Sequence, residues 1–235
     1  MIWEEAMKIK TLACSGFVLL ATLAAAQPSK APYPSMAPVE QYMMERGAEI
    51  ALARSAGPNS VAKDAGVMVM GRHGYETAVK GTNGFVCVVE RSWTAPSNDP
   101  NFWNPKLRGP VCLNAAAVRT YLPLTIKKTE LVLAGATKAQ MFAGMKTAFD
   151  KKELPALEPG AMSYMLSKQG YLGDGNGHWH PHVMYFMPLT DAAAWGADVP
   201  GSPIFSNASP EDRLRLFFVL VAKWSDGTVD NEQTH

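Results

Sequence analysis

Prolines and glycines interrupt this chain at short intervals, and that spacing limits the folds open to it. The 235 residues include 17 prolines and 19 glycines. Proline fixes φ and removes a backbone donor, and glycine favours turns, so much of the backbone is expected to be irregular. Apolar residues still make up 47% of the chain and charged residues 18%, which supports a sizeable core. The composition therefore predicts one domain rich in turns and argues against a helical bundle.

Short apolar and β-branched runs separated by turn residues predict the strands of that domain. These runs cover residues 67–70, 75–79, 85–89, 162–166, 183–187 and 216–224. The first three follow one another closely and predict successive antiparallel strands. Helical spacing of apolar residues covers residues 39–55, 114–121 and 137–151. We therefore expect an α+β fold: an antiparallel sheet of five or six strands, with two main helices packed on it and long proline-rich loops.

The first residues have the composition of a targeting segment. A basic stretch, MKIK at residues 7–10, precedes an apolar run, and Ala24 and Ala26 supply small residues at a cleavage position. The apolar part from Leu12 to Ala26 has 15 residues, fewer than the roughly 20 needed to span a bilayer. A membrane anchor is therefore the weaker alternative to a signal peptide.

This pattern divides the chain into three parts. We expect residues 1–26 to be the signal peptide, residues 27–38 to be a proline-rich arm, and residues 39–235 to form a single globular domain. The mature chain would then be periplasmic or secreted, with no stable membrane span.

Removing the signal peptide leaves two cysteines, Cys87 and Cys112. Disulfides persist in the oxidising compartments that exported proteins enter, so a bridge between these two is the favoured pairing. The alternative is a pair of buried free thiols, which behave as small apolar side chains.

The strongest concentration of reactive side chains lies in residues 170–188, GYLGDGNGHWHPHVMYFMP. Three of the five histidines occur there with one residue between each pair: His178, His180 and His182. An extended backbone would place these three on one side, with Trp179 and Pro181 on the other. Two imidazoles at this spacing can share a metal ion, and a bend at Pro181 would bring the outer ones closer.

We therefore expect a transition-metal site at the three histidines, with zinc ahead of copper. Candidate additional ligands are His73, Glu90 and Asp174. The alternative is a half-exposed strand whose histidines are hydrogen-bonded and inert. The spacing Asp174-x-Asn176 also matches the start of a calcium loop, but the glutamate that ends such a loop is missing.

Other function classes have weaker support in the sequence. The net charge is +1 and the 22 basic residues are scattered, so nucleic acid is not expected as a partner. The chain has no GxSxG motif and no phosphate-loop or dinucleotide fingerprint, and the SxxK spacing occurs once, at residues 60–63 (SVAK), without the SDN and KTG motifs that accompany it in β-lactamases. No catalytic nucleophile can be assigned from these patterns.

Two functions remain open. The first is an exported metal-dependent enzyme, most simply a hydrolase that uses metal-activated water. The second is a non-catalytic binding protein, whose partner would be a small molecule or an envelope component. Its aromatic-lined surface would be formed by Trp93, Phe102, Trp103 and Trp179.

Several longer motifs resemble those of uncharacterised exported bacterial proteins. They are GRHGY (71–75), KGTNGFVCVVERSW (80–93), FWNPKLRGPVC (102–112), LEPGAMSYMLSK (157–168) and KWSDGT (223–228). The resemblance covers nearly the whole mature chain. It implies export, and because no activity is known for such proteins it implies no catalytic role or cofactor.

Overall fold

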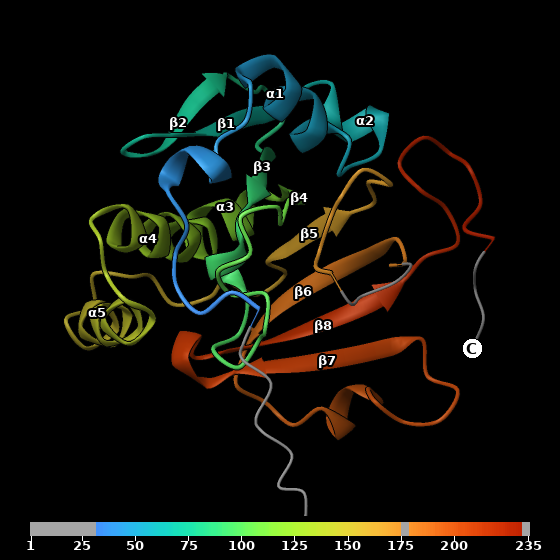
Figure 1. The fold of residues 1–235 in the computed structure, drawn as a ribbon. Coiled ribbons are helices and arrows are strands. Elements are labelled where there is room, and N and C mark those ends of the chain that lie inside the picture. Colours follow the sequence, from blue (N-terminus) through green and yellow to red (C-terminus); the bar gives the residue numbers. More distant parts are fainter. Residues whose placement is uncertain (1–31, 175–178, 232–235) are drawn as a thin grey trace, which may run out of the picture. The chain divides into compact units, whose positions relative to one another are not determined.

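A mixed sheet organises the part of the chain that the computed structural model describes, residues 32–174 and 179–231 (Figure 1). Within these residues the sheet has eight strands in the order β2-β1-β3-β4-β5-β6-β8-β7. The strands are β1 (Gly66–Gly71), β2 (Gly74–Val79), β3 (Val86–Glu90), β4 (Gly109–Leu113), β5 (Met162–Met165), β6 (His182–Pro188), β7 (Ile204–Ser209) and β8 (Leu214–Leu220). The predicted α+β class is confirmed, but the expected five or six strands are too few.

The expectation of a purely antiparallel sheet is also wrong. β1 and β2 form the predicted antiparallel hairpin, whereas β3 pairs with the other edge of β1 and runs parallel to it. To reach that edge, the short connection after β2 crosses the start of β1. A Cβ at Gly81 would lie 2.7 Å from the carbonyl carbon of Ala65, so this close crossing requires glycine.

Five α-helices accompany the sheet in the described residues. They are α1 (Arg46–Arg54), α2 (Asn59–Ala62), α3 (Ala115–Thr120), α4 (Leu122–Leu133) and α5 (Lys138–Asp150). Short 3-10 turns are η1 (Val39–Tyr42), η2 (Ser92–Thr94), η3 (Ala193–Trp195) and η4 (Pro210–Asp212). The first predicted helix, 39–55, is therefore divided between η1 and α1.

Local capping explains where these helices begin. The Glu45 carboxylate accepts hydrogen bonds from the backbone of Gly47 and Ala48, which starts α1 after η1. Thr137 is the N-cap of α5 and forms a capping box with Gln140. Pro123 lies in the first turn of α4, where its missing N–H costs nothing.

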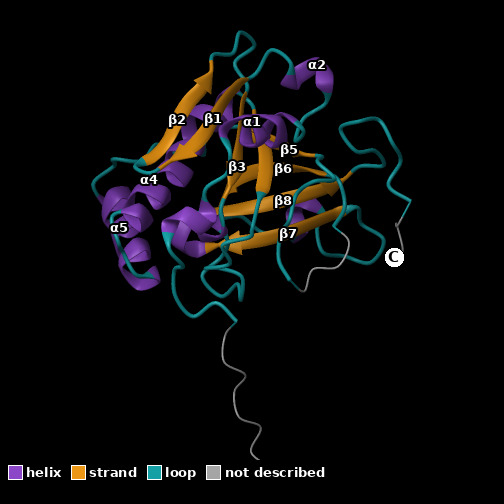
Figure 2. Cartoon of the chain, turned by 45° about the horizontal axis from the view of Figure 1, so that its top comes forward, coloured by secondary structure: helices purple, strands orange, loops and turns teal. Residues whose placement is uncertain are grey.

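The helices cover both faces of one part of the sheet. Alternate residues of β3 point to opposite faces, so Cys87 and Val89 join the core under α1, while Val88 joins the core under α3 and α4. Figure 1 shows α5 beyond α4, near the end at which β8 begins, where Met145 of α5 packs with Leu214, and Figures 1 and 2 both show β8 running away from the two helices. No helix within the described residues is both long enough and apolar enough to cross a membrane.

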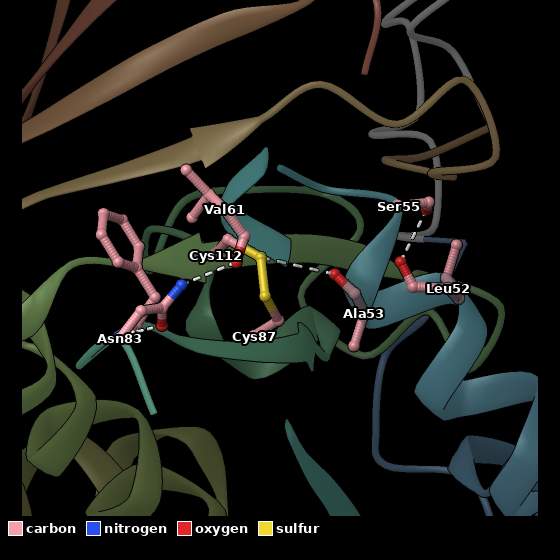
Figure 3. Close-up of a disulfide and its surroundings, with 8 residues drawn as sticks. Leu52, Ala53, Ser55, Val61, Asn83, Cys87 and Cys112 are labelled. Carbon is pink, nitrogen blue, oxygen red and sulfur yellow. Dashed lines mark hydrogen bonds between the residues drawn. A yellow bond between two sulfur atoms is a disulfide. The ribbon is translucent and has the colours of Figure 1, made fainter. Parts of the chain in front are cut away.

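The predicted disulfide is present between β3 and β4. Cys87 and Cys112 lie directly opposite each other on these antiparallel strands, with their Cα atoms 4.0 Å apart. Figure 3 shows the bridge beside Ala53 of α1, whose carbonyl oxygen lies 3.8 Å from the Cys112 sulfur. Both cysteines are fully buried, so the bond fastens two central strands beneath α1.

Candidate functional site

Two of the predicted histidines lie where the chain enters β6. The strand begins at His182, while His180 lies before it and outside any strand. His178 lies outside the described residues. The rings of Trp179 and His182 contact each other edge to face, with centroids 5.8 Å apart. The expectation that Trp179 points away from the histidines is therefore wrong, because the segment before β6 is not a regular strand.

His180 is held by a carboxylate from the end of the chain. Its Nδ1 lies 2.6 Å from Oδ2 of Asp230. The Asp230 side chain is buried, with 1% exposed, while 29% of the His180 side chain is exposed. An ionised carboxylate can only accept, so Nδ1 of His180 carries the hydrogen in this pair. Asp230 therefore determines both the orientation of the ring and which nitrogen is protonated.

His182 has its own anchor. Its Nδ1 lies 2.8 Å from the backbone carbonyl oxygen of His180, and this oxygen can only accept. In the neutral ring, Nε2 then keeps a lone pair. This buried atom has no hydrogen-bond partner among the described residues. Burial lowers the pKa of His182, and the nearby His180 ring lowers it further. The hydrogen bond from His182 to the His180 carbonyl oxygen opposes this change.

Aromatic side chains surround the second imidazole. Phe218 of β8 contacts the ring of His182 edge to face at 5.5 Å between centroids. Trp179 contacts Trp224 in the same manner at 5.2 Å. A Cβ at Gly170 would lie 2.9 Å from the Trp179 ring, so a glycine there allows the indole to pack closely. Trp179 and Phe218 therefore pack against the buried imidazole of His182.

The other candidate ligands do not form a metal-binding group with His180 and His182 in the described part of the chain. His73 is exposed in the turn between β1 and β2, and Asp174 accepts hydrogen bonds from Tyr33 and Tyr171. Glu90 is buried at the end of β3. Across residues 32–174 and 179–231, no three or more His, Cys, Asp or Glu side chains are grouped to hold a metal ion.

Glu90 belongs to a separate buried polar cluster between the sheet and α4. Its Oε1 accepts hydrogen bonds from the Tyr121 hydroxyl at 3.1 Å and the Thr125 hydroxyl at 3.0 Å. A buried ion pair, Lys128 with Asp212 at 2.6 Å, lies nearby. Burial raises the pKa of Glu90, and the two hydroxyl donors and Lys128 only partly offset that effect.

Replacing Glu90 with glutamine is expected to stabilise the protein at pH 8 and to have little effect at pH 4. Burial raises the folded-state pKa of Glu90 above the ordinary value of 4.5. The contribution of protonated Glu90 to the free energy of unfolding is therefore fully present below pH 4.5. That contribution is lost as the pH rises through the folded-state pKa. Glutamine keeps the acceptor oxygen but does not titrate. Urea unfolding of both proteins across this pH range measures the difference in free energy of unfolding. If that free energy changes with pH in the same way for both proteins, the expectation is contradicted.

Three of the four aromatics proposed for a binding surface belong instead to the core. Trp93, Phe102 and Trp103 are 0%, 1% and 5% exposed. They pack with Tyr42 and Met141, and the described end of the proline-rich arm lies against them. Trp93 and Phe102 therefore do not form that alternative surface, whereas Trp103 contributes to the lining of a hollow with Met36 and Ala136.

Sequence reasoning missed the two residues that complete the histidine site from the end of the chain. Asp230 and Trp224 lie in or next to a stretch that looks like a polar tail. The Asp230 amide donates to the Ala222 carbonyl at 3.0 Å, which folds this stretch back on the residues that follow β8. No spacing signal connects Asp230 with His180, because the two are 50 residues apart.

The resemblance to uncharacterised exported proteins stays a prediction. Comparison with protein-family models, with curated proteins and with solved structures finds no match to this chain.

Proposed function

We propose that this protein is an exported metal-binding protein in which His180 and His182 hold a divalent transition metal, zinc ahead of copper. We further propose that it acts as a hydrolase. The third imidazole of the predicted set, His178, lies outside the described residues, so the proposal is argued from the other two.

The observation that carries the proposal is how the two rings are anchored. Histidines that bind metals almost always donate their other ring N–H to a carboxylate or a backbone carbonyl, which orients the ring and selects the tautomer. His180 donates through Nδ1 to the Asp230 carboxylate, and His182 donates through Nδ1 to a backbone carbonyl. In His182 this anchor leaves Nε2 as the nitrogen suited to coordination.

The surroundings of His182 favour binding over an inert role. A buried polar atom without a partner is costly, and Nε2 of His182 is such an atom among the described residues. A bound ion would satisfy it. Trp179 and Phe218 restrict the motion of the ring, which lowers the entropic cost of coordination.

Hydrolysis is the simplest chemistry for such a site. A zinc ion held by imidazoles lowers the pKa of its water and so supplies a nucleophile near neutral pH. The residues of the chain bind and orient: Asp230 holds His180, and the aromatic rings hold His182.

Metal content and zinc affinity test the proposal directly. The exported protein, purified without a histidine tag, is expected to retain about one zinc per chain by elemental analysis. After chelation, calorimetric titration with zinc should show binding at least about tenfold weaker for His182→Ala. Asp230→Asn should weaken binding about 10- to 100-fold, since outer partners of metal ligands have effects of that size.

His73→Ala is the matched control, because it removes an exposed imidazole from the distant β1–β2 turn. It should bind zinc like the unaltered protein. Circular dichroism must show that each variant is folded. A folded protein that retains no zinc, and that binds added zinc equally in all variants, would refute the proposal.

A further inference from the structure

An apolar hollow lies beside the start of β7 and the end of β8. Its volume is about 920 Å³, within the range of small-molecule binding sites. Val199, Pro203, Phe205 and Leu220 contribute to its lining. Two of these are unusually exposed for apolar side chains, Val199 at 49% and Phe205 at 47%. Exposed apolar surface around a concave site is typical of ligand binding.

The hollow adjoins the histidine site through neighbouring strands. Leu220 lies directly opposite His182 in the β6–β8 pair, and Phe205 lies directly opposite Phe218 in the β7–β8 pair. Side chains paired in this way share a face of the sheet, with Cβ atoms about 4.5–5.5 Å apart. Figure 1 shows β8 running away from α4 and α5, so this end of the face lies beyond that helical layer.

The lining favours an uncharged occupant. Asp198 is the charged residue that contributes to the hollow. Its carboxylate already accepts from the Ser206 amide at 2.8 Å and from the Ser206 hydroxyl at 2.6 Å. The remaining contacts come mainly from aliphatic side chains, with one aromatic ring. A hydrocarbon group matches this surface better than a charged or strongly polar one.

Asp198 also argues against a partner strand as the occupant. Its amide donates to the Ile204 carbonyl at 3.0 Å, and its carboxylate accepts from the Ser206 amide, both on β7. These bonds occupy backbone groups that an added strand would need. The edge of β7 is therefore closed at its first residues, next to the hollow.

We propose that the hollow binds the hydrocarbon acyl chain of an uncharged ester, whose carbonyl group lies at His182. The reaction part of this inference rests on the proposed function. Water adds to the ester carbonyl carbon, the bond from that carbon to the alcohol oxygen breaks, and the alcohol leaves with a proton. The products are a carboxylic acid and an alcohol, with water as the co-reactant.

Binding is tested separately from catalysis with an uncharged apolar fluorophore, N-phenyl-1-naphthylamine. Its fluorescence should rise with the purified protein and fall when decanol competes for the hollow. Phe205→Asn should weaken binding about five- to tenfold through lost apolar contact. Leu189→Asn is the matched control, because Leu189 is 50% exposed but is not part of the lining. It should bind the fluorophore normally.

Catalysis is then measured with the zinc-loaded protein on 4-nitrophenyl acetate and 4-nitrophenyl decanoate. Phe205→Asn should raise KM for the decanoate. KM for the acetate should stay the same, because its methyl group is too short to reach the hollow. His182→Ala should lose hydrolysis of both esters and still bind the fluorophore, so failure of the metal site is distinguishable from failure of the hollow. Equal loss of fluorophore binding in Phe205→Asn and Leu189→Asn would overturn the inference. So would light scattering that shows a dimer dissociated by Phe205→Asn, because a second copy would then be the occupant.

Discussion

Replacing Arg91 with methionine is expected to lower the free energy of unfolding by about 3–5 kcal/mol. The guanidinium is fully buried, and its Nη2 lies 2.8 Å from Oε1 of Glu49, which is also buried. Arg91 further donates to the carbonyl oxygens of Tyr42 and Val89. Methionine fills a similar volume but leaves the Glu49 charge buried without its cation.

This ion pair also fastens secondary-structure elements together. Glu49 of α1 accepts from the Met70 amide of β1 at 3.1 Å, while Arg91 follows β3 and holds η1 through Tyr42. Urea unfolding followed by tryptophan fluorescence measures the loss. In a double-mutant cycle with Glu49→Gln, the second change should cost less once Arg91 is gone, because the unpaired charge is then removed.

Arg119→Met is the matched control for this experiment. Arg119 and Glu158 form a similar pair at 2.6 Å, but both side chains are well exposed. Solvent screens such a pair, so its loss should change stability little. Equal effects at Arg91 and Arg119 would contradict the importance assigned to burial.

Removing the disulfide is expected to cost about 3–4 kcal/mol, from the entropy that the bridge removes from the unfolded chain across a separation of 25 residues. Cys87→Ala with Cys112→Ala tests this, because both side chains are buried and alanine introduces no polar group. Urea unfolding should show a lower midpoint for the double variant. Reductant should lower the midpoint of the unaltered protein and leave that of the double variant unchanged.

The same samples distinguish a bridge from two buried thiols. Iodoacetamide added under denaturing conditions without reductant should modify neither cysteine of the pair in the unaltered protein. Modification of both would show free thiols, and an unfolding midpoint insensitive to reductant would agree with that result.

Local patterns in the sequence predicted most strands because each carries its signal in its own residues. Residues 85–89 and 183–187 are short, apolar and β-branched or aromatic, and they become β3 and β6. β4 was missed because GPVCL begins with turn-forming residues, and all five of its residues are buried, so no alternation marks it. β7 was missed because IFSNAS is a half-polar edge strand that follows a loop.

Strand order, by contrast, depends on contacts that local patterns do not contain. The run of three strands from β1 to β3 looks like a simple antiparallel series. The close approach of Gly81 to the start of β1 instead lets the chain cross and pair β3 in parallel. Whether the chain crosses in this way depends on packing between segments, because a glycine turn suits either connection.

For the candidate site, the sequence by itself determined that one residue separates His180 from His182, which limits their Cα atoms to about 7 Å apart. It also identified the two cysteines that become paired. Only the tertiary structure decided what holds the imidazoles: Asp230 reaches His180 from 50 residues away, and Phe218 of β8 packs against His182. Such partners meet because the sheet places β6 beside β8, and because residues 229–230 fold back on residues 222–223, which follow β8. Separation along the chain hides these contacts from any local pattern.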